Sequence, residues 1–260
     1  MPERDSEMTQ DQYVESILAK YAVPRGPTSP AEQLGSAVAG PIRTWAGQQL
    51  NALEYSGSYA KETGVRGISD VDVFISLKAD TQGTLKDLYH SLYALAQKQG
   101  WSSRAQSVSV GVTVNGTLGD LVPGRVQPGY QNYHSLYLRK RDSWTQTNVS
   151  LHVQTVRDSG RVKEIRAVKV WRFLRGLDFP SLYLELFTIQ ALAGRSQTAL
   201  AENVLQALRT IGTSLTSTRI EDPANTNNAL SDELTKQEKD RIAGLAAQST
   251  REQSWGKIIW

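Results

Sequence analysis

Apolar and polar residues alternate over a short stretch in the first third of the chain, which is the pattern of a β-strand. Between residues 69 and 77, four aliphatic side chains occupy every second position from Val71 to Leu77. Successive side chains on a strand point to opposite faces, so these four would pack on one side. Asp70 and Asp72 would then project together from the other side. The sequence therefore predicts a strand that presents two neighbouring carboxylates in front of an apolar core.

A second alternating stretch predicts a β-hairpin. Valine occupies every second position of residues 108–114, an Asn-Gly pair follows at 115–116, and a short apolar run covers Thr117–Pro123. An Asn-Gly pair between two apolar runs is the strongest short-range signal for a two-residue hairpin turn. Asp120 would lie on the second strand of this hairpin.

Apolar residues at helical spacing dominate much of the remaining chain. Ser29-Pro30-Ala31-Glu32 has the residues of a capping box with proline at the first helical position, so a helix should begin at Ser29. Pro41 should bend this helix without ending it. Further helices are predicted at residues 11–24, 88–100, 165–176, 181–192 and 200–215, and after the capping box of residues 235–238. The chain thus divides into a mixed α/β half, residues 1–160, and a helical half, residues 161–260.

Two polar stretches lie between these elements. Residues 125–150 mix tyrosine and tryptophan with arginine and lysine. Such a mixture can stack bases and hold phosphates, but aromatic residues that pack a long connection beneath solvated arginines are the commoner case. Asp222-Pro223-Ala224-Asn225, followed by Asn227-Asn228, is typical of a loop that organises the helical half.

The composition indicates a globular protein without disulfide bonds. Of 260 residues, 39% are hydrophobic and 21% are charged, which are ordinary globular values. No apolar run approaches the length of a membrane-spanning helix, and the polar start Met1–Asp5 lacks the apolar region of a signal peptide. We therefore expect a cytoplasmic protein with no membrane partner.

The cysteine and histidine content limits the kinds of metal and catalytic site that the chain can form. The chain has no cysteine, which excludes disulfides, thiolate metal sites and a cysteine nucleophile. Its three histidines lie far apart in sequence, without the spacing of zinc ligands. The net charge of +3 suits anionic substrates such as nucleotides, although it is also normal for a soluble protein surface.

The three aspartates have two readings. Neighbouring carboxylates repel each other, and a fold tolerates them most easily around a hard cation such as Mg²⁺, which binds through carboxylates and substrate phosphates. A two-metal site for phosphoryl transfer needs a third carboxylate near Asp70 and Asp72, and Asp120 on a neighbouring strand can supply it. The alternative is that all three are solvated residues at strand ends and edges.

Several motifs favour the first reading, because their order resembles a known superfamily. The chain resembles the nucleotidyltransferases that include DNA polymerase beta, and within them the cGAS/DncV-like branch, called CD-NTases, and their oligoadenylate synthetase relatives. The resemblance covers most of the chain. It rests on Gly57-Ser58-Tyr59-Ala60-Lys61 with Thr63, Ser69-Asp70-Val71-Asp72-Val73, Gly119-Asp120-Leu121-Val122-Pro123, Lys169 with Trp171, Ser181 to Glu185, and the Asp222 to Asn228 segment.

The resemblance implies an α/β (α+β) fold with a palm-like sheet, an N-terminal spine helix and a C-terminal helical lobe. It implies that Asp70, Asp72 and Asp120 are catalytic and hold two Mg²⁺ ions, with Mn²⁺ as a possible substitute. A nucleoside triphosphate would bind between the sheet and the helical lobe. Its phosphates would contact Gly57 and Ser58 from one side and, by analogy with the family, Lys169 and Ser181 from the other.

The chain departs from the family pattern in two ways. Glu62 stands where relatives usually have glycine, which puts a carboxylate near the expected triphosphate. The chain is also short, with little room for the inserted zinc or RNA-sensing elements of some relatives. We therefore do not expect a nucleic acid activator, whereas an effector or regulatory protein partner remains compatible with the sequence.

Three functions are compatible with these observations. The first is a Mg²⁺-dependent nucleotidyltransferase that makes cyclic or short linear oligonucleotide second messengers from nucleoside triphosphates, with a role in bacterial anti-phage defence. The second adds nucleotides to an RNA or DNA 3′ end, as tRNA nucleotidyltransferases and poly(A) polymerases do. The third is a catalytically silent nucleotide-binding protein. The complete set of three aspartates favours the first and second over the third, and the modest net charge favours the first.

Overall fold

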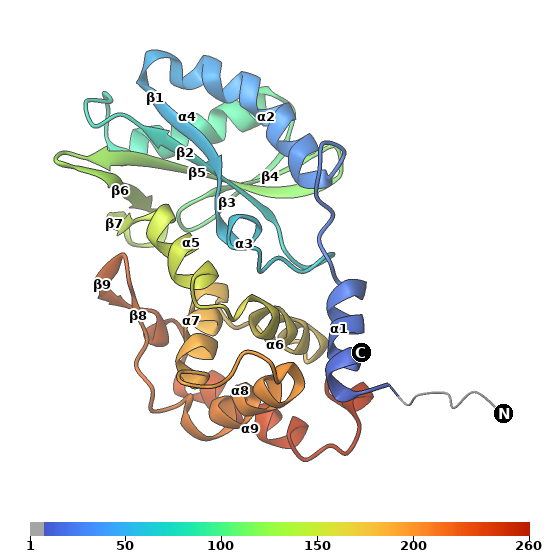
Figure 1. Cartoon of the computed structure of the whole chain (residues 1–260). Coiled ribbons are helices and arrows are strands. Elements are labelled where there is room, and N and C mark those ends of the chain that lie inside the picture. The colour runs from blue at the N-terminus through green and yellow to red at the C-terminus, as the bar shows by residue number, and fades with distance from the viewer. Residues whose placement is uncertain (1–7) are drawn as a thin grey trace.

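A computed structural model describes residues 8–260 of the chain. The polar residues Met1–Asp5, on which part of the expected location rests, lie outside the described residues. The molecule has an upper half built around a β-sheet and a lower half built from helices (Figure 1). The mixed α/β architecture expected from the sequence is confirmed.

The sheet has seven strands in the order β1-β2-β5-β4-β3, and β6 pairs with both β5 and β7. Strands β2 and β5 are parallel, whereas the other neighbours run antiparallel. The strands are β1 (Leu50–Tyr55), β2 (Val71–Leu77), β3 (Ser102–Ala105), β4 (Val110–Val114), β5 (Thr117–Gln127), β6 (Tyr130–Leu138) and β7 (Ser143–Thr147).

The predicted hairpin is confirmed. Strands β4 and β5 pair from Val114 opposite Thr117. The two turn residues have positive φ, 50° at Asn115 and 78° at Gly116, which is the conformation of the Asn-Gly hairpin turn. Val108 lies before the strand rather than in it.

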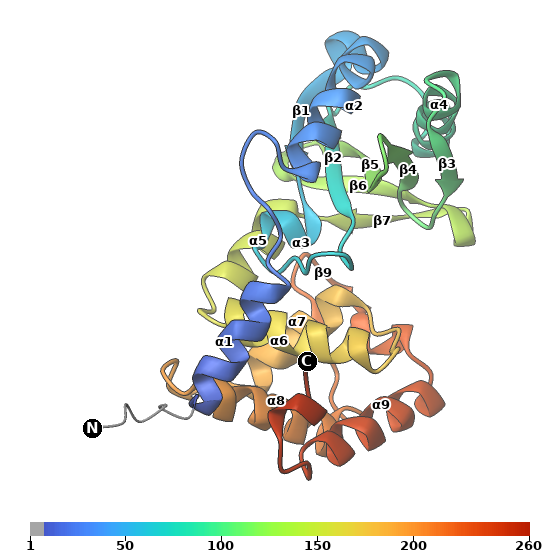
Figure 2. The same ribbon diagram turned by 90° about the vertical axis from the view of Figure 1, so that its right-hand side faces the viewer.

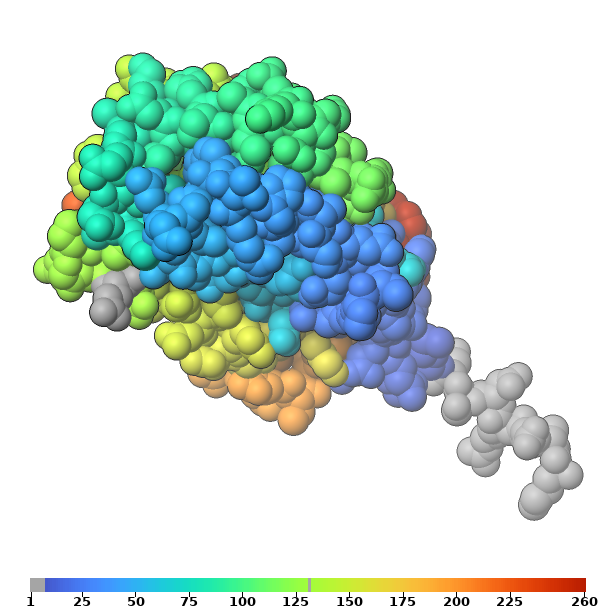
Figure 3. Space-filling model, turned by 90° about the horizontal axis from the view of Figure 1, so that it is seen from above, coloured from blue at the N-terminus to red at the C-terminus, as the bar shows by residue number. Residues whose placement is uncertain are grey.

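Helices α2 (Pro30–Ala46) and α4 (Leu85–Lys98) cover the upper face of the sheet, as seen from above in Figure 3. The Ser29 hydroxyl accepts the Glu32 backbone N–H, so the predicted helix start is confirmed. The helix continues through Pro41 to Ala46. The aliphatic residues of β2 from Val71 to Leu77 pack with these helices in one buried cluster, as the alternation predicted.

Three local predictions are corrected. Residues 125–150 are not a long connection, because they form the ends of β5 and the strands β6 and β7, followed by the start of α5 (Val149–Arg157). The predicted loop around Asp222 contains a small hairpin of β8 (Glu221–Asp222) and β9 (Asn225–Ala229). The first helix ends at Lys20, not before Pro24. Strand β7 and the β8–β9 hairpin are short and largely exposed or half-buried, so they gave weak apolar periodicity.

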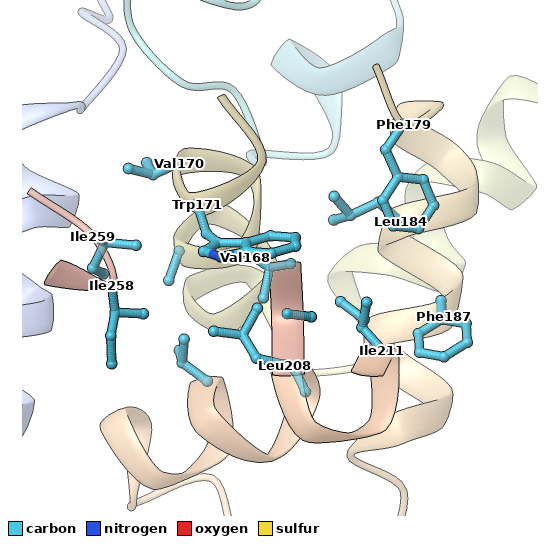
Figure 4. Close-up of a cluster of buried hydrophobic side chains, with 14 of the residues drawn as sticks. Val168, Val170, Trp171, Phe179, Leu184, Phe187, Leu208, Ile211, Ile258 and Ile259 are labelled. Carbon is cyan, nitrogen blue, oxygen red and sulfur yellow. The ribbon is translucent and has the colours of Figure 1, made fainter. Parts of the chain in front are cut away.

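The lower half holds a second buried cluster (Figure 4). Its centre is Trp171, which is fully buried and donates its indole N–H to Ser249 over 2.9 Å. The helices are α1 (Gln10–Lys20), α6 (Val162–Leu174), α7 (Ser181–Ala191), α8 (Leu200–Ser214) and α9 (Lys236–Ser249). Apolar residues of α1 belong to this cluster, although α1 comes first in the chain. The division at residue 160 therefore stays a prediction.

Helix α3 (Gly57–Ala60) lies between the two halves, as the side view in Figure 2 shows. It follows β1 directly, and the loop after it leads to β2. The connection from β1 through α3 to β2 therefore brings a short, sharply turning segment to the boundary between sheet and helices.

Within residues 8–260, no helix is both long and apolar enough to cross a membrane.

Candidate active site

Two of the three predicted aspartates face each other across neighbouring strands. The parallel register of β2 and β5 places Asp72 directly beside Asp120. Asp70 precedes β2 by one residue instead of opening the strand, so strict alternation does not set its direction. The hairpin turn fixes the register of β5, and thereby the position of Asp120.

Asp70, Asp72 and Asp120, here called the acidic cluster, bring carboxylates of like charge close together. Burial, Asp120 and Asp70 together raise the pKa of Asp72 to about 6, although Lys61 and Lys169 act to lower it. Burial and Asp70 also raise the pKa of Asp120. Like charges close together disfavour ionisation of each group. The cluster therefore lacks positive charge.

Two side chains from the β3 region partly compensate the acidic cluster. The Arg104 guanidinium lies 3.4 Å from the Asp70 carboxylate and 3.9 Å from that of Asp120, with half of its side chain exposed. Gln106 donates its amide N–H to Asp120 Oδ1 over 2.6 Å. These contacts hold Asp70 and Asp120 but leave the Asp72 carboxylate without a cation in direct contact among the described residues.

The turn before α3 presses against the Asp72 side chain. Gly57 has φ of 55°, and a Cβ atom added there would lie 1.7 Å from Asp72 Oδ2. The Ser56 backbone N–H donates to the Asp72 carbonyl over 2.9 Å. Only glycine fits both the backbone conformation and the space. The Ser58 carbonyl accepts the Thr63 backbone N–H over 3.0 Å.

A cavity of about 190 Å³ opens beside Gly57 and Asp72. Its wall is otherwise mostly apolar and combines sheet residues with residues of α5. His152 of α5 also lines it and is held by Asp222, with 2.6 Å between Nε2 and Oδ1. The same Asp222 oxygen accepts the Ala224 backbone N–H over 2.8 Å, which is the turn-organising contact expected of an aspartate there.

Glu62 turns away from this cavity. Its φ is 63°, a left-handed conformation that glycine adopts without strain, and this conformation explains the glycine expected here. Its carboxylate lies 3.0 Å from the Arg157 guanidinium, and it lines a separate pocket with Arg25 and Arg166. The carboxylate is therefore directed to a basic surface and not toward Asp72.

Lys169, predicted as a phosphate ligand, is buried in a cluster of four polar residues. Its ammonium lies 2.5 Å from Glu185 Oε1 and donates to the Thr63 hydroxyl over 2.9 Å. Lys61 lies 2.6 Å from the other Glu185 oxygen. Burial alone would raise the pKa of Glu185, but Lys169 and Lys61 outweigh it and lower that pKa to about 2. The Lys169 ammonium is thus committed to protein partners in this arrangement.

Ser181 is the first residue of α7. The residue that caps this helix is Pro180, so Ser181 is not the N-cap. Its hydroxyl accepts a hydrogen bond from Arg172 over 3.3 Å. Its predicted phosphate contact, like that of Lys169, stays a prediction.

Asp70, Asp72 and Asp120 offer oxygen donors of the kind that a divalent cation takes. As the side chains stand in residues 8–260, no three acidic or histidine side chains are grouped closely enough to hold a metal ion. The donor chemistry nevertheless fits, because burial and neighbouring carboxylates raise the pKa values of Asp72 and Asp120, and a hard cation would relieve this repulsion. Asp70 would have to exchange its contact with Arg104 for the cation.

Solved structures identify the fold. No protein-family model matches the chain, and no curated protein sequence matches it. The E. coli MS115-1 CdnC structure with ATP superposes with a TM-score of 0.74 at 19% identity, covering 97% of this chain and 98% of CdnC. The chain has the fold of the CD-NTases. The same CdnC in its HORMA-deltaN complex matches similarly, with a TM-score of 0.74 at 18% identity, covering 98% of each chain.

A more distant CD-NTase gives the same answer. The Bradyrhizobium diazoefficiens CD-NTase CdnG, solved with GTP, has a TM-score of 0.78 at 12% identity, covering 96% of this chain and 92% of CdnG. Coverage near the full length of both chains shows that the helical half is part of the shared CD-NTase fold. The fold expected from the sequence resemblance is therefore confirmed.

Three residues with clear site contacts were not singled out from the sequence. Arg104 lies in β3 and Gln106 directly after it, and this exposed four-residue strand has no apolar alternation, so no pattern drew attention to them. Glu185 did carry a signal: it stands within the apolar run Leu182–Phe187 of a predicted helix. A charged residue inside an apolar run needs a buried partner, and here it has two lysines.

Proposed function

We propose that this chain is a Mg²⁺-dependent nucleotidyltransferase that joins nucleoside triphosphates into cyclic or short linear oligonucleotides with release of pyrophosphate. The observation that carries the proposal is the placement of Asp72 beside Asp120 and against Gly57. A phosphate bound at the Gly57 turn would then lie close to both carboxylates, as phosphodiester formation requires.

The carboxylates and the Gly57 turn would have separate roles in the reaction. Asp70, Asp72 and Asp120 would hold the divalent cations, and the carboxylates would face the acceptor hydroxyl and the α-phosphate. When bound, such cations supply Lewis-acid charge that favours loss of the acceptor proton and neutralises the leaving pyrophosphate. The Gly57 turn would allow close approach of a phosphate, and the Ser58 hydroxyl could donate a hydrogen bond to it.

The solved CD-NTases support the substrate class. CdnC and CdnG were solved with ATP and GTP respectively, and an Elizabethkingia meningoseptica CdnE is described as a cyclic dinucleotide synthase. CdnC also occurs in a complex with HORMA-deltaN, which supports a protein partner as a possible regulator here. A role in anti-phage defence rests on the family resemblance alone.

Product analysis tests the proposal. Purified protein would be incubated with Mg²⁺ or Mn²⁺ and all four ribonucleoside triphosphates, treated with phosphatase, and analysed by mass spectrometry and pyrophosphate release. We expect a phosphatase-resistant oligonucleotide and matching pyrophosphate from the wild type and from an Asp80→Asn control, whose carboxylate is exposed and outside the cluster. Extension of an added RNA primer without a free oligonucleotide product would support end-addition instead. Nucleotide binding without pyrophosphate release would support the silent alternative.

A further inference from the structure

Four polar side chains form a buried cluster, here called the interlobe cluster, between the loop after α3 and the helical half. Lys61 and Thr63 come from that loop, Lys169 from α6 and Glu185 from α7. Their side chains are between 0% and 7% exposed. The contacts join segments that lie more than 100 residues apart in sequence.

Glu185 is the centre of the interlobe cluster. One carboxylate oxygen lies 2.6 Å from the Lys61 ammonium, while the other accepts from Lys169 over 2.5 Å and from the Thr63 hydroxyl over 2.6 Å. Both oxygens are therefore used, and both receive charge-assisted or short hydrogen bonds. Removal of this one carboxylate would leave two ammonium groups buried without a counter-ion.

The loop held by Glu185 is continuous with the phosphate-binding turn. The Lys61 backbone N–H donates to the Gly57 carbonyl over 3.2 Å, and the Thr63 backbone N–H donates to the Ser58 carbonyl over 3.0 Å. The segment 57–63 is thus one hydrogen-bonded unit. Fixing the side chains at its end also fixes the position of the turn at its beginning.

We propose that Glu185 is a positioning residue, which anchors Lys61 and Thr63 to the helical half and so holds the Gly57–Ser58 turn beside Asp72. This inference rests on the proposed function for its catalytic consequence, but the anchoring itself needs no nucleotide. It assigns Lys169 to the anchor and makes direct phosphate binding by either lysine unnecessary.

The first test is Glu185→Gln, which preserves the shape and removes the charge. Two buried lysines lose their counter-ion, so the melting temperature should fall by about 10 °C. Amide hydrogen exchange in peptides covering residues 57–64 should accelerate more than in the core of α8, and KM for nucleoside triphosphate should rise by about tenfold. Glu202→Gln, the same change in an exposed ion pair, is the matched control and should change none of these values.

The sign of the KM change separates this proposal from direct phosphate binding. If the lysines bound phosphate themselves, freeing them from Glu185 would lower KM, and that result would overturn the positioning role. Glu185→Asp keeps the charge on a shorter side chain, so it should recover part of the melting temperature and part of the KM.

A second variant tests the proposal if Glu185→Gln fails to fold. Lys61→Met, Thr63→Val, Lys169→Met and Glu185→Leu together replace the interlobe cluster with apolar residues, a change that often preserves stability. We expect a melting temperature within about 5 °C of the wild type, with exchange in residues 57–64 still accelerated. Wild-type exchange in that segment would show that packing alone positions the turn, and would overturn the proposal. Because melting and exchange need no nucleotide, they remain decisive if no product is formed.

Discussion

Asp72 is a half-buried and Glu185 a fully buried carboxylate at the boundary between sheet and helices, and their surroundings shift their pKa values in opposite directions. Burial and two neighbouring aspartates raise the pKa of Asp72 to about 6. Glu185 is buried as well, but two lysines lower its pKa to about 2. The same chemical group is therefore left short of positive charge in one place and fully paired in the other.

This difference distinguishes a candidate cation-binding site, the acidic cluster, from a structural ion-pair cluster, the interlobe cluster. In the interlobe cluster two ammonium groups compensate the one carboxylate, so the charge of Glu185 needs no ligand. The acidic cluster has Arg104 at its edge and no cation in direct contact with Asp72 among the described residues. A fold that keeps such a cluster pays in stability for an arrangement suited to binding a cation.

The two carboxylates should respond oppositely to acid. Asp72 has a folded-state pKa above its ordinary value of 3.8, so its unfavourable contribution is present above pH 6 and disappears as the pH falls toward 3.8. Glu185 has a folded-state pKa below its ordinary value of 4.5, so its stabilisation is present above pH 4.5 and is lost as the pH falls toward 2.

The largest expected effect comes from Asp72→Asn. The change removes a proposed cation ligand but also removes repulsion, so product formation should fall at least about a thousandfold, or about 4 kcal/mol, while the free energy of unfolding stays equal or rises. Steady-state kinetics and urea unfolding at pH 7.5 measure both. Loss of activity together with a large loss of stability would indicate that Asp72 supports the fold, as Glu185 does.

Lowering the pH should change cation binding less than Asp72→Asn changes product formation. A proton on Asp72 competes with a divalent cation, so a pKa of about 6 predicts that Mn²⁺ affinity falls about tenfold between pH 7 and pH 5. Calorimetric titration across this range would measure it. A flat profile would mean that Asp72 does not bind the cation.

Arg104→Gln should have the smallest effect. Its half-exposed guanidinium lies near Asp70 and Asp120, where solvent screens its charge, so its removal should strengthen Mn²⁺ binding by only about fivefold, or about 1 kcal/mol. Calorimetry at low ionic strength measures the gain. Arg141→Gln, an exposed arginine of the β6–β7 connection, is the control. Weaker binding in Arg104→Gln would show that Arg104 organises the carboxylates instead of competing with the cation.

The sequence predicted those parts of the fold that depend on local pattern. Alternation located β2 and the hairpin, and the Asn-Gly turn fixed the register that carries Asp120. It could not predict that β2 and β5 pair in parallel with Asp72 beside Asp120, because the intervening segment sets that pairing through tertiary contacts. Strand β7 lacks an apolar face, and the buried positions of β6 include His134 as well as Leu136 and Tyr137, so their pattern resembled a connection.

The sequence predicted which residues belong to the candidate site better than it predicted what those residues contact. Gly57 is required by a backbone φ of 55° and by the Asp72 side chain, a reason that the motif alone does not give. Lys169 was expected to reach phosphate from the helical side, whereas its ammonium contacts Glu185 and Thr63. Burial and pairing of a lysine depend on which helices pack together, so the apolar spacing of α6 could not reveal them.

Mn²⁺ affinity in the presence of ATP tests the central claim most directly, because it depends on the acidic cluster and requires no turnover. Wild-type chain would be compared with the Asp70→Asn, Asp72→Asn double variant by calorimetry at pH 7.5, with Asp80→Asn as the control. The account predicts that the double variant binds Mn²⁺ at least about a hundredfold more weakly, or about 2.7 kcal/mol, with unchanged binding in the control. Equal Mn²⁺ affinity in the double variant and the wild type would contradict it.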